Sequence, residues 1–316
     1  MIKNNLPKTW KFVSLNQVAE KPKYGYTASA SNEGNAQFLR ITDITGSGIN
    51  WQTVPFCICS EKETKKYLLA EDDILFARMG ATTGKTCIIK SPPLSVFASY
   101  LIRVKVKKEI NPNYLYFFLQ SSFYWNQINS NKHNSLKKGV NASVISNIEL
   151  PLPPLEEQKK IAAVLSLVQK AISQQEKAIA LTTELKKALM QKLFTEGTRN
   201  EAQKMTEIGV IPESWEVLPF DKFALLQRGK DLPRKQFKSG NVPVIGATQV
   251  IGYHNQAFVK APGVTVVRSG SSAGLPLFIQ KDFWAHNVVL YVKKFNGNVP
   301  KFVYYKIQNL DLTKYN

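Results

Sequence analysis

Cysteine is scarce in this sequence, which holds only Cys57, Cys59 and Cys87 among its 316 residues. An odd number of cysteines argues against a disulfide framework, and the N-terminus MIKNNLPKTW lacks the apolar core of a signal peptide. Long apolar runs are missing too, because none approaches the roughly 18 residues of a membrane-spanning helix. We therefore expect a soluble, cytoplasmic protein that has no membrane span and keeps its thiols reduced and buried.

Residues that bind metals are equally sparse. The three histidines, His133, His254 and His286, are scattered along the chain. No second pair of ligands stands at a suitable spacing from Cys57 and Cys59. The sequence therefore predicts no metal site.

Acidic residues are few relative to basic ones. The chain has 42 lysines and arginines against 23 aspartates and glutamates, which gives a formal net charge of +19. This balance favours a polyanionic partner such as nucleic acid. Charge alone is also compatible with a solvated basic surface, a ribosome-associated protein or a protein at a membrane surface, so other features must decide.

The two halves of the chain carry the same signals in the same order, which indicates an internal duplication. Residues 6–10 (LPKTW) match residues 211–215 (IPESW), and residues 72–84 (DDILFARMGATTG) match residues 262–274 (PGVTVVRSGSSAG). The longer match places Arg78 on Arg268. Further matches pair Phe97-Ala98 with Trp284-Ala285, and residues 112–116 with 300–304. The repeat is far longer than the roughly 20 to 50 residues of a solenoid unit, so each copy is a whole domain.

Each copy reads as a strand-rich α+β domain. Residues 73–78, 86–90 and 101–107 are rich in valine, isoleucine and phenylalanine and are bounded by glycine, proline or serine, which predicts strands. Residues 114–120 predict a short helix. The expected fold class is α+β and multi-domain, with two repeated domains.

A different pattern separates the copies. No glycine or proline stands between Glu156 and Glu196, and apolar residues recur near heptad spacing, interrupted by Gln175 and Thr182. These positions, which we call the seam, are Ile161, Leu165, Val168, Ile172, Ile179, Leu185, Leu189 and Leu193. The pattern predicts one long coiled-coil-type helix of about 40 residues, roughly 60 Å in length. Another helix, from this chain or from a partner, must cover its seam.

Three enzyme motifs are approached but not completed. Residues 80–86 (GATTGKT) resemble a phosphate-binding P-loop, but the glycines are one residue too close and a strand follows instead of a helix. Residues 111–114 (NPNY) miss the base-holding segment of amino-methyltransferases, and no methyl-donor loop is present. Residues 63–65 (ETK) form an acidic-x-lysine triplet without a matching acid before it. The sequence therefore disfavours catalysis by this chain.

What remains is the chemistry of contact with DNA. An arginine beside a glycine-containing loop lets a guanidinium and bare N–H groups approach a phosphate or a guanine edge. The same glycines also serve simply to turn a hairpin, and single lysines are most often solvated. We expect DNA contacts in these loops and in nearby basic, loop-like segments, at Lys23, Tyr24, Tyr26, Arg40, Arg78, Gly80, Thr82, Lys85, Lys137, Lys138, Gly139, Arg228, Lys230, Arg268, Gly270 and Ser271.

The joint between the first domain and the long helix, residues 150–162 (LPLPPLEEQKKIA), resembles the conserved joint of type I restriction-modification DNA specificity subunits. Residues 193–197 (LFTEG) and 208–215 (IGVIPESW) resemble the end of that family's helix and the opening of its second domain. The resemblance covers almost the whole chain. It implies two target recognition domains, residues 1–153 and 211–316, joined by the helix 154–197 and a linker, residues 198–210.

The resemblance also implies a function. In that family the subunit has no catalytic activity, and each recognition domain reads one half of a bipartite site on double-stranded DNA. The helix recruits modification subunits and, through them, restriction subunits. We therefore expect the seam to bind subunits, and we expect no cofactor in this chain, because methyl donor, ATP and magnesium belong to the partners.

The sequence departs from the family at its end. The resemblance implies a second helix that packs antiparallel to the first, and the sequence stops before one begins. We expect a truncated second domain and a seam that is open to self-association. Two alternatives stand beside this reading: a DNA methyltransferase or endonuclease that acts by itself, and a coiled-coil scaffold that binds protein.

Overall fold

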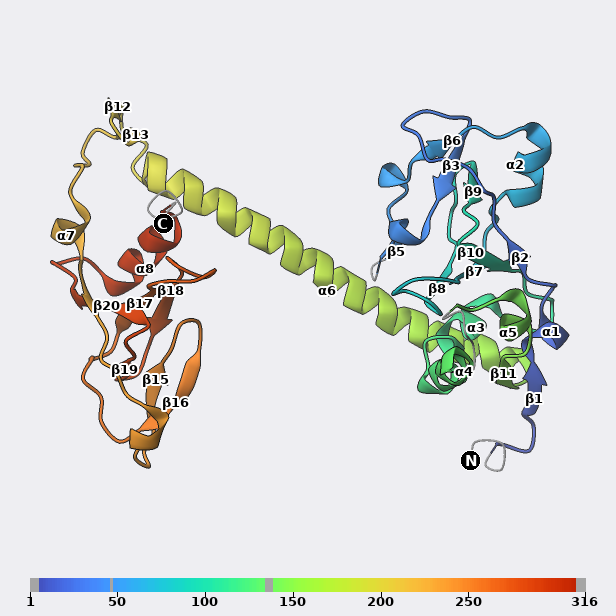
Figure 1. The fold of residues 1–316 in the computed structure, drawn as a ribbon. Helices are drawn as coiled ribbons and strands as arrows, with labels where there is room; N and C mark the ends of the chain where they lie inside the picture. Colours follow the sequence, from blue (N-terminus) through green and yellow to red (C-terminus); the bar gives the residue numbers. More distant parts are fainter. Residues whose placement is uncertain (1–5, 46–47, 134–138, 311–316) are drawn as a thin grey trace. The chain divides into compact units, whose positions relative to one another are not determined.

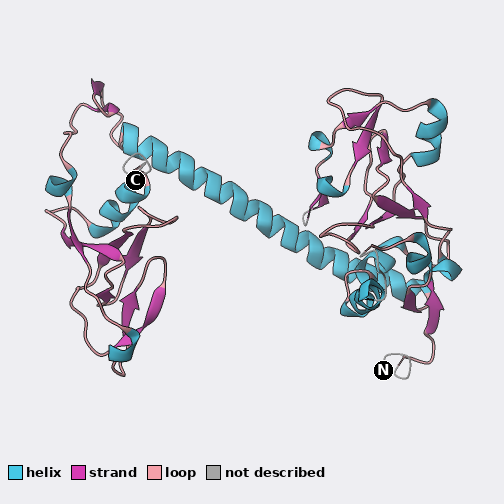
Figure 2. Ribbon diagram, viewed as in Figure 1, coloured by secondary structure: helices cyan, strands magenta, loops and turns pink. Residues whose placement is uncertain are grey.

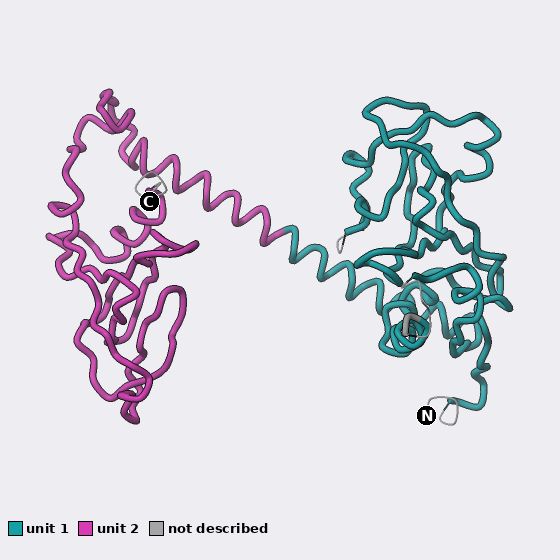
Figure 3. The backbone as a smooth tube through the Cα atoms, viewed as in Figure 1, with its two compact units in different colours: residues 1–177 teal, residues 178–316 magenta. Residues whose placement is uncertain are grey.

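The computed structural model describes residues 6–45, 48–133 and 139–310. The chain divides into two compact units, residues 1–177 and residues 178–316, which we call unit 1 and unit 2 (Figure 3). The division falls inside one long helix, α6 (Leu155–Glu196), so the first part of this helix belongs to unit 1 and its last part to unit 2. The single long helix expected over residues 154–197 is thus present.

Unit 1 consists of short strands and several helices (Figures 1 and 2). Its elements before α6 are β1 (Lys11–Ser14), α1 (Leu15–Val18), β2 (Lys23–Tyr24), β3 (Ala36–Leu39), η2 (Ile41–Asp43), β4 (Ile44–Thr45), β5 (Gly48–Ile49), η3 (Trp51–Thr53), β6 (Phe56–Cys57), α2 (Glu61–Tyr67), β7 (Ile74–Ala77), β8 (Thr86–Ile88), β9 (Ser95–Phe97), β10 (Leu101–Val104), α3 (Pro112–Phe118), α4 (Ser122–His133), α5 (Ala142–Ser146) and β11 (Glu149–Leu152).

Unit 2 repeats much of this order after α6. Its elements are β12 (Gln203–Thr206), β13 (Gly209–Pro212), α7 (Phe220–Phe223), β14 (Leu225–Arg228), η4 (Arg234–Gln236), β15 (Val242–Ile245), β16 (Val250–His254), β17 (Gly263–Val267), β18 (Pro276–Ile279), β19 (Trp284–Ala285), β20 (Val289–Lys294) and α8 (Pro300–Gln308). Residues 198–210, expected to be a linker, include most of the antiparallel pair β12 and β13.

The two units contain the same pair of sheets, which confirms the two strand-rich domains. A four-stranded antiparallel sheet has the order β2-β10-β7-β8 in unit 1 and β14-β20-β17-β18 in unit 2. A three-stranded sheet has the order β6-β3-β9 in unit 1 and β16-β15-β19 in unit 2. In both, the middle strand is antiparallel to the first strand and parallel to the last.

Both faces of the four-stranded sheet of unit 1 are buried. Ile74 and Phe76 of β7 lie in one core cluster with residues of α3, α4 and α5, whereas Leu75 and Ala77 lie in a second cluster on the opposite face. Successive side chains of a strand point to opposite faces, so burial on both sides explains the unbroken apolar run ILFA. In unit 2, residues 263–267 of β17 are likewise all buried.

One predicted correspondence is wrong by one residue. Phe97-Ala98 was expected to match Trp284-Ala285. In the structure the carbonyls of Ala98 and His286 each accept a hydrogen bond from the N–H three residues later, so Ala98 corresponds to His286. In unit 2 the aromatic residue is one position earlier in the strand, where Trp284 packs edge-on against Phe258. Similarity of residue type therefore misplaced the register, because neighbouring strand residues face opposite sides.

The start of α6 is fixed to unit 1 by a buried amide. Gln158 is 1% exposed, and its side chain donates to the carbonyls of Pro153 (2.8 Å) and Glu109 (3.1 Å) and accepts from the N–H of Asn111 (2.8 Å). Ala162 is also buried in the core cluster that contains α3. These contacts satisfy the polar atoms that burial removes from water.

Candidate nucleic-acid interface

The loop that follows β7 is a tight turn with an arginine at its first position. The N–H of Arg78 donates to Tyr100, and the N–H of Gly84 donates to Ala77 at 2.8 Å, which closes the loop. Gly80 and Gly84 have φ values of +80° and +90°, a region that favours glycine. Within the described residues, the N–H groups of residues 79–82 donate to no acceptor. The loop therefore presents free donors next to an arginine.

The side chain of Arg78 is held in one direction by an aromatic ring. Its guanidinium carbon lies 4.8 Å from the centroid of the Tyr24 ring, and one terminal nitrogen lies 3.5 Å from the carbonyl oxygen of Ser99. The Nε atom is buried and has no hydrogen-bond partner in the described part of the chain. A cation stacked on a ring loses freedom of direction, so this guanidinium is oriented before any ligand arrives.

A third segment completes the site in unit 1. The N–H of Val140 donates to the carbonyl of Arg78 at 2.9 Å, and the N–H of Ala142 donates to the hydroxyl of Tyr24 at 3.1 Å. Gly139 precedes these residues directly, whereas Lys137 and Lys138 lie outside the described residues. The structure thus brings together three segments that were predicted separately.

Unit 2 repeats the loop with the same backbone. The N–H of Arg268 donates to Val288, the N–H of Gly274 to Val267, and the N–H of Ala273 to Gly270, as in the corresponding turn of unit 1. Gly270 has a φ of +91°, and nothing lies within 4 Å of the position that its Cβ would take. Arg268, Gly270 and Ser271 are exposed. The match of Arg78 with Arg268 is therefore confirmed in the fold.

Two predicted contact residues have other partners. The guanidinium of Arg40 makes two hydrogen bonds with Asp43, at 2.8 and 3.0 Å, and this partner raises the arginine's pKa. Tyr26 packs against Phe38 and Tyr67, and burial together with the neighbouring Glu63 carboxylate raises its pKa. Both residues contribute to packing within unit 1.

The remaining predicted residues lie at the surface. Lys23, Lys85, Arg228 and Lys230 are exposed, and Thr82 is half-buried. The ammonium of Lys230 lies 4.7 Å from the centroid of the Phe258 ring.

The sequence did not indicate three residues of this site, and two of them, Ser99 and Ala142, contact it only through the main chain. Both contribute backbone atoms, and backbone contacts leave no residue-type signal in a sequence. Tyr100 was missed as well: its carbonyl accepts from the N–H of Arg78, and its side chain is exposed beside the loop.

The seam of α6 is largely exposed. Ile161 is half-buried against the core cluster of unit 1 that contains α3. The other seven positions are exposed, from 39% at Leu165 to 66% at Ile179. Leucine and isoleucine side chains left in water along one helix form an apolar surface of the kind that marks protein contact sites.

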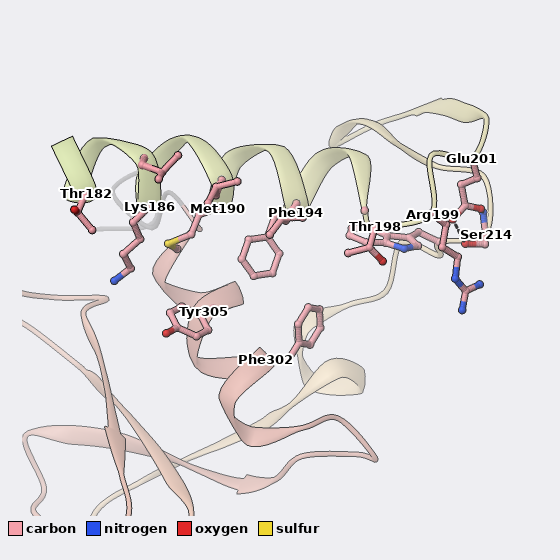
Figure 4. Close-up of a pocket in the computed structure, with 15 residues that line it drawn as sticks. Thr182, Lys186, Met190, Phe194, Thr198, Arg199, Glu201, Ser214, Phe302 and Tyr305 are labelled. Atoms are coloured by element: carbon pink, nitrogen blue, oxygen red, sulfur yellow. Dashed lines mark hydrogen bonds between the residues drawn. The ribbon is translucent and has the colours of Figure 1, made fainter.

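Within unit 2 the end of the seam opens into a groove of about 910 Å³ between α6 and α8. Leu185, Leu189 and Leu193 are among the residues that line it. Phe194 of α6 points towards Phe302 of α8, and their ring centroids are 5.7 Å apart (Figure 4). The ammonium of Lys306 lies 5.3 Å from the ring of Phe194, and burial lowers its pKa.

No group of three or more histidine, cysteine or acidic residues lies close enough to hold a metal ion in the described ranges. Among the helices of those ranges, none has the length and apolar character needed to cross a bilayer.

Two copies of one strand-rich fold, each with a loop that begins at an arginine and contains two glycines, define a two-domain chain in which one long helix joins the domains. A family model described as the type I restriction modification DNA specificity domain matches residues 7–182. The chain belongs to this family.

Individual relatives agree with that assignment. The predicted type I restriction enzyme MjaX specificity subunit of Methanocaldococcus jannaschii is 30% identical over 246 residues, which cover 73% of this chain and 57% of the relative. The MjaVIII specificity subunit of the same organism is 32% identical over 179 residues, 56% of this chain and 41% of the relative. The S subunit of a type I restriction-modification system from M. genitalium has the same fold, with a TM-score of 0.64 at 14% identity, over 100% of this chain and 79% of that one.

Proposed function

We propose that this chain is a non-catalytic DNA sequence-recognition subunit of a type I restriction-modification complex. Each unit reads one part of a bipartite site on double-stranded DNA. The observation that carries the proposal is the repeated loop, in which Arg78 and Arg268 occupy the same place in two copies of one sheet. The chain spans 57% and 41% of the length of the two M. jannaschii relatives, which are both named specificity subunits.

The charge of the chain supports DNA as the ligand. The net charge of +19 suits a polyanion. Arg78, stacked on Tyr24, has the fixed direction that a guanidinium needs to meet the O6 and N7 atoms of guanine. Free N–H groups in the adjacent loop suit phosphate oxygens, which position a protein on the duplex.

The proposal assigns catalysis to the partners. Modification subunits bind the seam of α6 and bring the methyl donor, and restriction subunits join through them with ATP and magnesium. The exposed seam supports this assignment, because apolar side chains along a helix gain stability when another helix covers them. In the absence of those partners, we propose that a second copy of the chain covers the seam.

Salt-dependent binding of the purified chain to duplex DNA tests the proposal. Phosphate contacts release counterions, so the logarithm of the binding constant should fall linearly with the logarithm of the salt concentration. A protein scaffold would give no such slope. Addition of methyl donor and magnesium to the same mixture should produce neither methylated nor cleaved DNA, and either product would instead support an enzyme that acts by itself.

A further inference from the structure

The residue that lies beside the loop arginine differs between the two units. Tyr24 of unit 1 is paired with Ile102 of β10, and Arg228 of unit 2 is paired with Leu290 of β20. Because β10 and β20 hold the same place in the two sheets, Tyr24 and Arg228 occupy equivalent positions.

The glycines that follow confirm this equivalence. Gly25 and Gly229 pack so closely on a backbone that an added Cβ would lie 2.2 Å from the carbonyl oxygens of Ala98 and His286, respectively. Those two residues correspond in the fold. The chain around the position is therefore fixed in the same way in both units, and only the side chain has changed.

The change replaces an aromatic ring with a second cation. Across the middle strand, Tyr24 lies level with Phe76 and Arg228 lies level with Val266. The loop arginine of each unit follows two residues later, so strand spacing and rise place its backbone roughly 12 Å from the residue on the far strand. Tyr24 and Arg78 reach across this gap and stack. In unit 2, the backbones of Arg228 and Arg268 lie across the same gap. Two extended arginine side chains that reach towards each other over this gap can hold one oxyanion between their guanidinium groups.

No acidic side chain of the described residues forms an ion pair with either arginine. Arg228 and Arg268 are both exposed, and neither forms an ion pair within the described ranges. The nearest acid along the chain, Asp231, accepts from the Asn287 amide at 2.8 Å and lies 3.6 Å from Nε2 of His286. The N–H groups of residues 269–272 also have no acceptor among the described residues and add donors beside Arg268.

We infer that Arg228 and Arg268 form a phosphate site in unit 2 that holds one backbone phosphate of DNA. This inference rests on the proposed function and extends it, because it makes the two loops chemically unequal. The planar forks of two arginines bind a phosphate through paired hydrogen bonds, and the site carries no sequence information. Unit 1 has no second cation at this position, so its stacked Arg78 is free for a base edge.

Salt dependence of duplex binding by the full chain tests the site. The slope of log K against log salt is negative. Arg228→Ala and Arg268→Ala should each reduce its magnitude by about one, equally for all duplex sequences. The double variant should reduce the magnitude of the slope by about one and no more, because both side chains hold the same phosphate. An additive loss of about two would mean separate phosphates and would overturn the shared site.

A reciprocal exchange sharpens the test. Tyr24→Arg should build a second such site in unit 1 and increase the magnitude of the slope by about one. Arg228→Tyr should reduce the magnitude by the same amount. Lys281→Ala removes a different exposed cation of unit 2. It is the matched control and should leave the slope unchanged. An unchanged slope in Arg228→Tyr contradicts the inference.

Binding of inorganic phosphate, measured beside duplex binding, distinguishes a site for a DNA phosphate from a site for a free anion. If the double variant loses binding of inorganic phosphate while duplex binding and its slope stay as in the wild type, the site holds free phosphate and the inference is wrong. A wild-type chain that binds no duplex even in low salt overturns the proposed function as well. A wild-type chain that binds, with a slope that neither arginine variant changes, overturns this inference alone.

Discussion

Unit 1 and unit 2 share a backbone frame but differ in the side chains that complete it. The sheets have the same strand order, and the loop arginine stands at the same turn in both. Unit 1 surrounds its arginine with Tyr24 and with the segment that contains Val140, whereas unit 2 places Arg228 there. Glycines and main-chain hydrogen bonds fix the backbone in both units, and this leaves the exposed side chains free to differ between them.

The largest expected difference between the units concerns the core beneath the loops. Phe76 of β7 is fully buried, and its counterpart in unit 2 is the smaller Val266. We expect Phe76→Ala to lower the stability of unit 1 by about 3–5 kcal/mol, and Val266→Ala to lower that of unit 2 by less, because the smaller residue leaves a smaller cavity.

Calorimetry of the full chain measures both effects. Each substitution should shift one unfolding transition and leave the other in place. If Phe76→Ala shifts both transitions equally, the two units do not fold independently, and the comparison between them loses its basis.

A second prediction concerns the part of the seam that belongs to unit 1. Lysine at Leu165 and Ile172 should abolish self-association, because two charges would have to be buried where apolar side chains now gain roughly 1.5–3 kcal/mol each on full burial. Sedimentation should then show a monomer, with unit 1 still folded. The control is lysine at Ser173 and Gln174, which are exposed polar positions outside the seam.

A wild-type chain that sediments as a monomer, and that these lysines do not change, would contradict the account of the seam.

A third, smaller effect is expected at a buried hydrogen bond that holds the end of the Arg78 loop in unit 1. The buried hydroxyl of Tyr124 donates to the carbonyl of Gly84 at 2.6 Å, and burial raises its pKa. Tyr124→Phe should lower the stability of unit 1 by about 1–2 kcal/mol, since a buried carbonyl loses its donor. Tyr304→Phe in α8 is the control in unit 2, and it should have no comparable effect on thermal unfolding.

A further effect, seen only at alkaline pH, follows from the cysteines, which all lie in unit 1. Burial raises the pKa of Cys57 to about 12, above the roughly 8.5 of a free thiol. The folded state therefore keeps its proton longer, and the stability of unit 1 should fall as the pH rises from about 8.5 towards 12. Cys57→Ala should flatten this fall in denaturant titrations of unit 1. Unit 2, which has no cysteine, is the internal control, and an identical pH dependence of unit 1 stability in the wild type and in Cys57→Ala would contradict the assignment.

The sequence was sufficient for the features that repeat or have a period. The helix expected at residues 154–197 is found at Leu155–Glu196, because heptad spacing and the absence of glycine and proline report directly on helix formation. The equivalence of Arg78 and Arg268 followed from an aligned run of thirteen residues. Local patterns of this kind do not depend on distant contacts.

Contacts between distant residues could not be predicted. The stacking of Tyr24 on Arg78 depends on how both strands pair with β10, and strand pairing has no signature in residue type. The buried role of Gln158 was also invisible, since its partners are backbone atoms. The pairing of Arg40 with Asp43, three residues away, could have been foreseen, because a short-range acid is the simplest partner for an exposed arginine.

The central claim, that each unit contacts its own part of the DNA site, is tested most directly by footprinting the full chain on its target duplex. Arg78→Ala should weaken protection over one part of the site, and Arg268→Ala over the other. A lost base contact should cost roughly 1–3 kcal/mol and change the preferred base, whereas a lost phosphate contact should weaken all sequences alike. Identical footprints for the wild type and both variants would contradict the claim and leave the loops as simple turns.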